Sequence, residues 1–488
     1  MSTRLHPPDR DLFEQVARAA FLNPFGAERA ALDASLAADA PKGPGDLVDR
    51  VLVRLRVRLD WLESVGRLDV TGFDDHDATL LEHAILFERF HRFGPDFERL
   101  LEAQLAAPER TLPVPFADAL LGGLQSAGIA PTRAERLMAL FWQMRRAYHF
   151  IDRGLVGRSE AMRALRADLW NAVFTVDIER YDRFLWDRME DFSVLLLGET
   201  GTGKGAAAAA IGRAGYVPWD PHRRAFADPF TESFVPLNLS EFPETLIESA
   251  LFGHAKGAFT GAVSDHDGAF TRCRPHGAVF LDEIGEVTPP VQIKLLRVLE
   301  ERAYTPVGGT TARRFDGRVL AATHRSLDRL RADGRFRDDF YHRLCSHVIA
   351  VPPLRTRIAE APAELDDLLA VVVERILGQP DADLCAEIRA ALDRDLPPEH
   401  PWPGNVRELA QRARRVMLTG GCADPPPAVS AARDPFLGSV GAGELDARDL
   451  IEGYCARLYH QHGTYEEVAR RTGLDRRTVR KYVKKAQG

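Results

Sequence analysis

The chain contains 488 residues, of which 45% are hydrophobic and 28% are charged. This length and composition predict a globular protein of about three domains. The formal net charge of -7 excludes a surface that is basic overall, so contact with nucleic acid would need a local basic patch.

The five cysteines are scattered without a CxxC pair, which argues against a disulfide framework and against a zinc site. The chain starts without an apolar signal segment, and apolar runs such as "SVLLLG" are too short to cross a bilayer. We therefore expect a cytoplasmic protein without a membrane partner.

Residues 1–150 are expected to form an α-helical domain. Apolar positions in "LVDRVLVRLRVRLDWL" and "AERLMALFWQMRRAYHFI" recur at spacings of three and four, as on one face of a helix. The pattern matches neither a phospho-acceptor receiver domain nor a strand-rich sensor of small molecules. We interpret this part as an input or protein-binding domain, with a purely structural oligomerisation domain as the alternative.

Residues 151–352 predict an α/β domain with a parallel sheet, because short apolar runs are followed by glycine-rich loops and helical segments. One loop follows the expected strand "FSVLLL" and precedes the alanine-rich "AAAAAIGRA", which is the setting of a phosphate-binding loop. This phosphate loop consists of Gly198, Glu199, Thr200, Gly201, Thr202, Gly203, Lys204 and Gly205.

The residue types of the phosphate loop suit that chemistry. Glycines let backbone N–H groups turn towards phosphates, Lys204 reaches the outer phosphates, and the N-terminus of the following helix adds positive potential. Gly205 stands where a hydroxyl side chain usually contacts magnesium, so we expect the metal to be held elsewhere. A glycine-rich turn with an incidental lysine is the alternative.

A second segment, "AVFLDEIGEV", reads as a buried strand that ends in Asp282 and Glu283. Adjacent carboxylates at a strand end repel each other unless a cation or a positive environment offsets the charge. We expect Asp282 to hold magnesium and Glu283 to orient and polarise an attacking water molecule. A solvated acidic turn is the alternative.

Residues 353–420 return to a helical pattern, residues 421–445 read as a linker rich in glycine, proline and alanine, and residues 446–488 form a basic helical unit. Thr464 and Glu467 predict a capping box, Gly473 a turn and Asp475 the cap of a second helix. This pattern indicates a helix-turn-helix, with a solvated amphipathic helix pair as the alternative.

The second helix of this unit would enter the major groove of double-stranded DNA. Residues expected to contact bases or phosphates are Arg476, Arg477, Thr478 and Lys481. Residues expected mainly to contact phosphates are Arg480, Lys484 and Lys485.

The stretch "KGAFTGA" places Phe259 and Thr260 between Gly257 and Gly261, outside any periodic pattern that would bury an aromatic side chain. The glycines allow a sharp bend, and an exposed aromatic ring beside a hydroxyl offers a partner both apolar area and a hydrogen bond. A hairpin whose phenylalanine folds back on its own subunit is the alternative.

Residues from about 154 to 409 closely resemble the AAA+ ATPases that activate sigma-54 RNA polymerase, the bacterial enhancer-binding proteins. The segment "ESALFGHAKGAFTGA" is similar to the surface-loop signature of that family. The resemblance implies that the loop moves out during the nucleotide cycle and that Phe259 and Thr260 contact the sigma factor. It also implies an AAA+ domain with a helical lid and a C-terminal helix-turn-helix of the Fis type.

Two strand ends also match the family. Asn238 in "FVPLNLS" resembles the switch asparagine that holds the catalytic glutamate, here Glu283. Its side-chain amide could keep the carboxylate away from water until the outer phosphate moves the strand. Thr323 and His324 in "LAATHRSL" resemble the sensor I position. The alternatives are a strand-end cap for Asn238 and a structural role for His324.

The remaining correspondences concern arginines. "GRFRDDFYHRL" resembles the arginine-finger segment and assigns Arg337 and Arg343 to a neighbour's nucleotide, with surface ion pairing as the alternative. "WPGNVREL" resembles the sensor II box, so Arg407 would contact the nucleotide of its own subunit. Because fingers act between subunits, the resemblance implies a homo-oligomeric ring, most simply a hexamer.

Together these features predict a transcription activator that binds upstream enhancer DNA and uses ATP and Mg²⁺ to remodel sigma-54 RNA polymerase into an open complex. One alternative is an AAA+ ATPase that remodels another protein. The other is a DNA-binding regulator that has lost ATP turnover through Gly205. Retention of Lys204, Asp282 and Glu283 argues against the last alternative.

Overall fold

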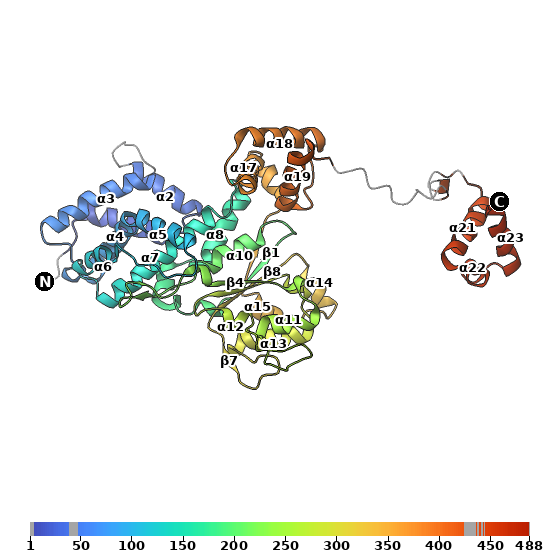
Figure 1. Ribbon diagram of the computed structural model, residues 1–488. Coiled ribbons are helices and arrows are strands. Elements are labelled where there is room, and N and C mark those ends of the chain that lie inside the picture. The colour runs from blue at the N-terminus through green and yellow to red at the C-terminus, as the bar shows by residue number, and fades with distance from the viewer. Residues whose placement is uncertain are drawn as a thin grey trace. The chain divides into compact units, whose positions relative to one another are not determined.

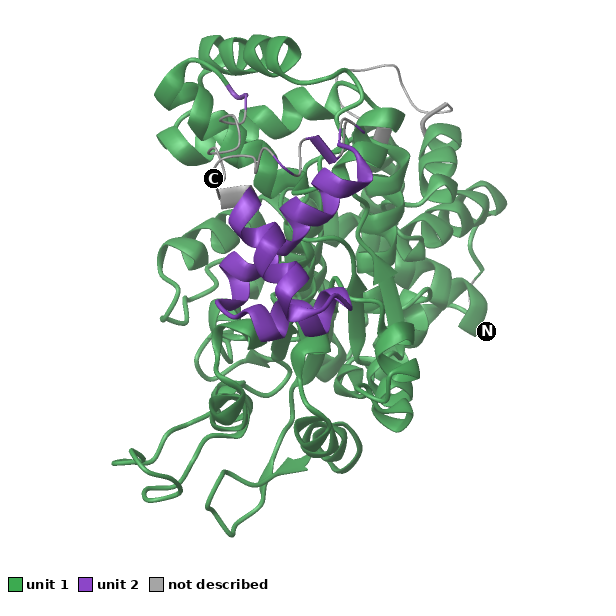
Figure 2. Ribbon diagram, turned by 90° about the vertical axis from the view of Figure 1, so that its right-hand side faces the viewer, with its two compact units in different colours: residues 1–421 green, residues 422–488 purple. Residues whose placement is uncertain are grey.

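The computed structural model describes residues 4–38, 47–423, 436, 439, 440, 443 and 445–487. The chain forms two compact units, Met1–Gly421 and Cys422–Gly488, which Figure 2 shows in different colours. The predicted linker, residues 421–445, lies largely outside the described residues. Within the described ranges, no helix is long and apolar enough to cross a membrane.

The first part of the larger unit is helical (Figure 1), as the spacing of its apolar residues predicts. Pro7 and Pro131 open α1 and α7, and the Asp74 side chain accepts the N–H of Asp77 at the start of α4. The helices are α1 (Pro7–Phe21), α2 (Ala27–Ala38), α3 (Leu47–Ser64), α4 (Asp75–Arg92), α5 (Gly94–Ala106), α6 (Ala117–Ser126), α7 (Pro131–Asp152) and α8 (Glu160–Phe174), with a 3-10 turn, η1, at Val70–Gly72.

A short connection leads from α8 to the sheet. It contains α9 (Ile178–Arg180), the π-helical turn η2 (Tyr181–Leu185) and the 3-10 turn η3 (Met189–Asp191). One hydrophobic core runs from α1 through α7 and α8 to the first strands and helix of the α/β part. The predicted domain limits at residues 150 and 352 therefore remain predictions, because no break in the core marks the first of them.

The α/β part contains a five-stranded parallel sheet in the order β4-β5-β8-β1-β9. Its strands are β1 (Val194–Leu197), β4 (Phe234–Asn238), β5 (Ala278–Asp282), β8 (Arg318–Thr323) and β9 (His347–Ala350). In register, Asn238 lies beside Asp282, and Leu197 lies beside Thr323. Because parallel strands share one carboxyl edge, the predicted strand-end residues gather there.

Helices and turns surround this sheet. The elements are α10 (Lys204–Gly212), η4 (Phe230–Glu232), η5 (Leu239–Glu241), α11 (Glu244–Phe252), α12 (Ala269–Arg272), η6 (Ile284–Glu286), α13 (Pro289–Glu301), α14 (Leu327–Ala332) and α15 (Asp338–Leu344). Two small antiparallel pairs join β2 (Trp219–Asp220) to β3 (Ala225–Phe226) and β6 (Ala303–Tyr304) to β7 (Arg313–Arg314). The α/β prediction is thus confirmed.

Four helices follow the last strand and form the lid: α16 (Leu354–Glu360), α17 (Glu364–Leu377), α18 (Ala382–Asp395) and α19 (Asn405–Thr419). Helices α16, α17 and α18 all contact α19. Buried leucine and valine side chains recur along α17 at helical spacing. A helical lid after the parallel sheet agrees with the fold class that the sequence predicts.

The smaller unit contains α21 (Ala447–His462), α22 (Tyr465–Thr472) and α23 (Arg476–Gln487) around a small apolar core. Gly473 ends α22 with φ 69°, and the Asp475 carboxylate accepts the N–H groups of Arg477 and Thr478, as predicted. The predicted capping box is wrong. The Thr464 side chain makes no cap hydrogen bond, and the Glu467 carboxylate pairs with Arg470 and Arg471 instead of reaching back to the start of α22.

Candidate functional site

The phosphate loop joins β1 to α10 and turns through two glycines in the left-handed region, Gly201 at φ 81° and Gly203 at φ 103°. Lys204, the first residue of α10, donates its Nζ to the carbonyl oxygens of Gly198 (2.9 Å) and Glu199 (3.1 Å). Burial lowers the pKa of Lys204. The loop is therefore a compact turn around a buried amine at a helix N-terminus.

Gly205 is exposed, and a Cβ atom added there would meet nothing within 4 Å. Glycine is therefore not required at this position by space. Since Gly205 has no side-chain oxygen, another residue would have to supply the protein's ligand to a magnesium ion in this site. Asp282, at the end of β5, is the predicted candidate.

Asp282 and Glu283 follow each other at the carboxyl edge of the sheet. The Asp282 carboxylate accepts the N–H of Glu283 at 3.0 Å, and Glu283 adopts φ 57°. Burial, followed by the neighbouring Glu283 charge, raises the pKa of Asp282. A bound cation would offset both effects, so the pair fits a magnesium site chemically.

Glu283 has a different partner from the one predicted. Its Oε2 lies 2.8 Å from Nδ1 of His324, which follows β8. The Asn238 amide donates instead to Glu241 Oε1 at 3.0 Å, and its Oδ1 accepts the N–H of Ser240 at 3.2 Å. Asn238 thus caps its own strand end, the alternative considered for it, although it lies in register with Asp282.

Thr323 lies under the phosphate loop. Its side chain is fully buried, its carbonyl oxygen accepts the N–H of Gly198 at 3.4 Å, and its Oγ1 accepts the N–H of Arg325 at 3.1 Å. The strand end that carries Thr323 and His324 is therefore attached to the loop on one side and to Glu283 on the other.

The lid reaches the phosphate loop through residues that sequence reasoning missed. Glu199 forms a bidentate ion pair with Arg355 of α16, with N–O distances of 2.6 and 2.8 Å. The Asn405 amide at the start of α19 donates to Glu199 (3.2 Å) and to the Thr200 carbonyl (3.1 Å). One sequence feature could have pointed to Asn405. It follows Pro-Gly in "PGNVR", and asparagine tolerates the left-handed backbone that it adopts there, with φ 51°.

Arg407 follows closely in α19. After burial, which has the largest effect on both groups, its positive charge adds to the lowering of the Lys204 pKa and offsets part of the rise in the Asp282 pKa. The next residue back, Val406, donates its N–H to the Gly201 carbonyl at 3.1 Å. The start of α19 thus holds Arg407 beside the phosphate loop, and its contact with a nucleotide stays a prediction.

Arg337 and Arg343 stand at opposite ends of α15. Arg337 is exposed and pairs with Asp339 (2.7 Å), which was the alternative considered for it. Arg343 donates twice to the Leu299 carbonyl (2.8 and 3.1 Å), so it is attached to α13 of its own chain. To reach a nucleotide of another subunit, Arg337 would have to break its ion pair with Asp339, and Arg343 would have to break its hydrogen bonds to the Leu299 carbonyl.

The loop of residues 256–262, the tip loop, closes through a hydrogen bond from Gly257 N–H to the Ala262 carbonyl at 2.8 Å. Gly257 and Gly261 have φ 80° and 103°, as the sharp bend requires. Thr260 is exposed, and Phe259 is 38% exposed with its ring centroid 4.9 Å from that of His254. The tip loop therefore presents an aromatic ring and a hydroxyl to solvent.

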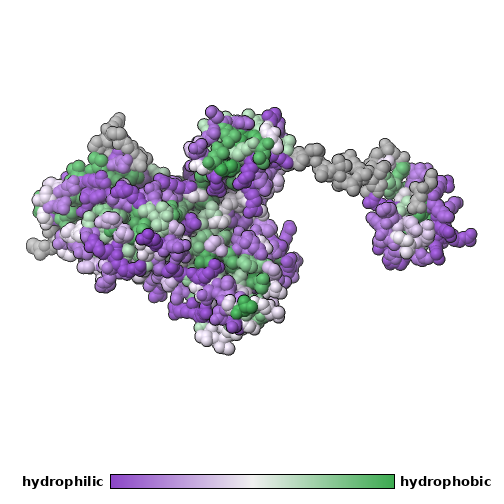
Figure 3. All heavy atoms as spheres, viewed as in Figure 1, coloured by the Kyte–Doolittle hydropathy of each residue, from purple (hydrophilic) through white to green (hydrophobic). Residues whose placement is uncertain are grey.

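The predicted DNA-contacting helix is α23. Its exposed basic side chains are Arg476, Arg477, Arg480, Lys481, Lys484 and Lys485, and the visible face of this unit is largely hydrophilic (Figure 3). Arg476 pairs with Glu466 (2.8 Å) and Lys485 with Glu452 (2.8 Å). The Thr478 hydroxyl is bound to Asp475. Those three side chains are thus partly engaged within the unit.

Comparison with known proteins agrees with this geometry. Residues 182–350 match the family model described as the sigma-54 interaction domain. The chain is 34% identical over 332 residues to the transcriptional regulatory protein ZraR of Klebsiella oxytoca, covering 67% of this chain and 67% of ZraR. The chain belongs to the family of sigma-54-dependent transcriptional activators. Its parallel sheet and helical lid form the AAA+ core of this family.

Other members of the sigma-54-dependent activator family are covered less completely. The DNA-binding transcriptional regulator NtrC of Azospirillum brasilense is 36% identical, covering 65% of this chain and 61% of NtrC. The Nif-specific regulatory protein of Azotobacter vinelandii is 45% identical, covering 46% of this chain and 40% of that protein. The chain thus spans only about half the length of several curated relatives. Among solved structures, NtrX from Brucella abortus is 23% identical with a TM-score of 0.41, covering 79% of this chain and 84% of NtrX.

Proposed function

We propose that this protein hydrolyses ATP with Mg²⁺ and uses the cycle to remodel sigma-54 RNA polymerase into an open complex. The observation that carries the proposal is the tip loop. Phe259 and Thr260 are exposed on a hairpin bent by two glycines, in a chain of the sigma-54-dependent family. Monomeric surfaces rarely keep an aromatic ring at a protruding tip without a partner.

The residues at the sheet's carboxyl edge suit nucleotide hydrolysis. In the proposed site, the phosphate loop and Lys204 hold the phosphates, and Asp282 holds Mg²⁺, which neutralises charge on them. Glu283 accepts a hydrogen bond from the attacking water and polarises it. His324, 2.8 Å from Glu283, positions that carboxylate.

The helix N-terminus and the lid support the same site. Lys204 begins α10, so the positive end of the helix dipole points at the loop. Asn405 and Arg355 attach the lid to Glu199, and Arg407 lies in the same turn of α19. Movement of the lid would therefore be transmitted directly to the phosphate loop.

The proposed assembly is a homo-oligomeric ring, most simply a hexamer, in which Arg337 reaches a neighbour's nucleotide. Arg337 suits this role because its guanidinium is exposed and its partner Asp339 is only two residues away. Exchange of an exposed ion pair costs little free energy. Arg343 donates to the Leu299 carbonyl of its own chain, so we expect it to contribute less than Arg337 to contact with a neighbour's nucleotide.

The C-terminal unit is proposed to bind double-stranded DNA upstream of the promoter. Helix α23 presents its basic side chains along an exposed face, and its N-terminal residues Arg476 and Arg477 begin the helix that would enter the major groove. Lys485 pairs with Glu452 across the unit, so we expect it to contribute less to phosphate binding than Lys484.

Binding to purified sigma-54 tests the proposal. The full chain is incubated with sigma-54, ADP and a metal fluoride that mimics the outer phosphate, beside the variants Thr260→Ala and Thr260→Ser. We expect binding that needs the mimic, is lost in Thr260→Ala and is retained in Thr260→Ser, because serine keeps the hydroxyl. Measurable ATPase activity without any sigma-54 binding would instead favour remodelling of another protein.

A further inference from the structure

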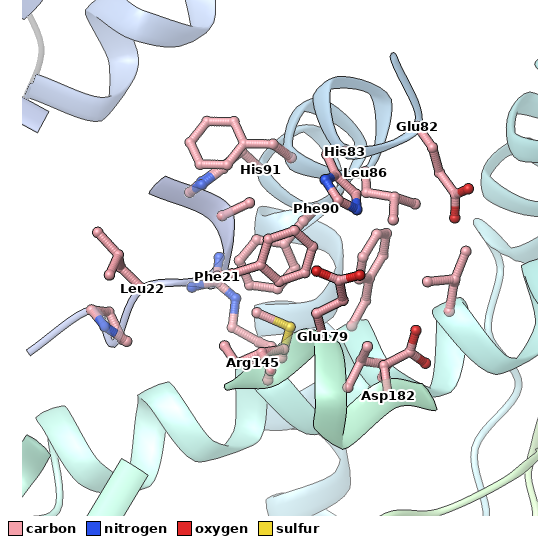
Figure 4. A pocket seen from close by; sticks show the side chains of 18 of the residues that line it. Phe21, Leu22, Glu82, His83, Leu86, Phe90, His91, Arg145, Glu179 and Asp182 are labelled. Atoms are coloured by element: carbon pink, nitrogen blue, oxygen red, sulfur yellow. The ribbon is translucent and has the colours of Figure 1, made fainter. Parts of the chain in front are cut away.

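The helical N-terminal part contains a cavity of about 730 Å³ that is partly open to solvent (Figure 4). Most of its lining comes from α4 and α7. The end of α1, α2, the start of α3, α8 and the connection that contains α9 and η2 supply the rest. This volume lies within the range of pockets that bind small organic molecules. The cavity lies in a different part of the larger unit from the phosphate loop, and its lining shares no residue with the proposed nucleotide site.

Apolar and aromatic side chains form much of the wall. Figure 4 shows Phe21, Leu86 and Phe90 around the cavity, and Leu140 and Phe141 of α7 also line it. Aromatic rings offer large, rigid contact areas to a flat apolar occupant. The main driving force for binding here would therefore be burial of apolar surface.

The charged side chains of the lining balance one another. The arginines are Arg29, Arg133, Arg136, Arg145 and Arg183, and the acids are Asp33, Asp49, Glu82, Glu179 and Asp182. Arg29 pairs with Asp33 at 2.9 Å, and Asp182 lies between Arg133 and Arg136. A charged occupant would have to compete with these ion pairs, whereas an uncharged one would not.

His83 is a polar side chain of this wall that has hydrogen-bonding capacity left, as has the indole N–H of Trp170. It lies edge-on to Phe21 with ring centroids 4.5 Å apart, and it takes part in no hydrogen bond among the described residues. Burial, with a smaller contribution from Arg133, lowers the pKa of His83 to about 4. The ring is therefore neutral near pH 7 and offers one donor and one acceptor.

We propose that this cavity binds an uncharged, mainly apolar organic molecule that carries one hydrogen-bonding group for His83. We further propose that this is how the N-terminal part receives its signal, which rests on the proposed ATPase function. Helix α7 supplies the physical link. The same helix lines the cavity through Leu140 and Phe141 and contacts the end of the phosphate-loop helix α10.

The link consists of buried polar contacts. Gln143 of α7 donates to the Ala214 carbonyl at 2.9 Å, and Arg146 donates to the carbonyls of Arg213 (2.7 Å) and Gly215 (2.8 Å). Tyr181 precedes the cavity residue Asp182 in the chain, and its hydroxyl donates to Gln143 Oε1 at 2.9 Å. An occupant would therefore touch two elements that meet at Gln143 and hold the end of α10.

Binding of N-phenylnaphthylamine, an uncharged fluorescent molecule with a single N–H group, tests the first claim on the full chain without nucleotide, DNA or sigma-54. We expect saturable binding that Leu86→Trp weakens by about tenfold or more, because the indole would occupy part of the space that the probe needs beside His83 and Phe90. Val57→Trp is the matched control, since Val57 is 62% exposed on α3 and outside the lining. Equal affinity in wild type and Leu86→Trp would overturn the site.

Two further comparisons define the chemistry. Anilinonaphthalenesulfonate, which adds a negative charge to nearly the same ring system, should bind about tenfold more weakly than the uncharged probe. His83→Leu should weaken binding of the uncharged probe about fivefold, and His83→Gln should restore most of it. A preference for the anion, or equal loss in both His83 variants, would contradict the proposed occupant.

The signalling claim has a separate readout. Saturating N-phenylnaphthylamine should change the affinity for a fluorescent ADP analogue by about fivefold, and Leu86→Trp should abolish that change. Probe binding without any effect on ADP affinity would overturn the claim that this cavity signals to the nucleotide site. Loss of sigma-54 binding would not affect either result, so failure of the proposed function can be distinguished from failure of this inference.

Discussion

Asn405 is the residue through which the lid is expected to hold the phosphate loop, and Asn405→Ala should release it. The side chain is fully buried. Its amide donates to Glu199 and Thr200, and its Oδ1 accepts the N–H of Leu354 at 2.7 Å. Alanine removes all three contacts, of which the two to Glu199 and Thr200 join the lid to the phosphate loop, whereas the contact to Leu354 lies within the lid.

The cost can be worked out from these contacts. Each of the two lost hydrogen bonds to the phosphate loop contributes about 0.5–1.5 kcal/mol, which together is about 1–3 kcal/mol, and alanine at the left-handed φ of Asn405 adds about 1 kcal/mol. The sum of about 2–4 kcal/mol corresponds to a population of the open lid that is about 30- to 700-fold larger.

Amide hydrogen exchange at Val406 measures this population. The hydrogen bond from the Val406 N–H to the Gly201 carbonyl joins the lid to the phosphate loop. The substitution at Asn405 alters neither of these two groups. We expect exchange of peptides containing Val406, followed by mass spectrometry on the full chain, to accelerate by about 30-fold or more in Asn405→Ala.

Asn405→Gly separates hydrogen bonding from backbone strain, because glycine adopts φ 51° freely but has no amide. Because it lacks the strain of about 1 kcal/mol, it should accelerate exchange at Val406 about fivefold less than alanine does, and still clearly above the wild-type rate. If Asn405→Gly exchanged at the wild-type rate, strain and not hydrogen bonding would explain the alanine result, and the reasoning above would be refuted.

Three further predictions concern the proposed mechanism. Glu283→Gln should lower ATP turnover about 100-fold or more with nucleotide affinity nearly unchanged, and normal phosphate release would remove Glu283 from the catalytic role. His324→Ala should lower turnover about tenfold at unchanged ADP affinity, because it loosens Glu283; an unchanged rate would make the 2.8 Å contact incidental. Arg477→Ala should weaken DNA binding about tenfold and leave ATP hydrolysis intact, so an unchanged footprint would place the DNA contact elsewhere.

The cavity and the shared core change how the N-terminal part should be tested. Deleting residues 1–150 would remove nearly all of α7, and α7 packs against α10. Such a deletion would expose apolar core and perturb the phosphate loop whatever the role of the removed part. Leu86→Trp, which narrows the cavity and leaves α7 in place, is the sharper perturbation.

Local chemistry let the sequence by itself predict much of the molecule. A strand followed by glycines and Lys204 specifies the phosphate loop, and Asp475 and Gly473 specify the turn between α22 and α23. Gly257 and Gly261 specify the bend of the tip loop. These features depend on residues a few positions apart, whose conformational preferences do not need the rest of the fold.

Only the tertiary structure decided which distant side chains meet. His324, 41 residues further along the sequence, contacts Glu283 where the sequence predicted Asn238. Asn405 contacts Glu199 from 206 residues away in the sequence. The cavity around His83 likewise needs α1, α4, α7 and η2 together. Which polar groups pair and where a void remains depends on how helices and sheet pack, and periodicity along the chain does not contain that information.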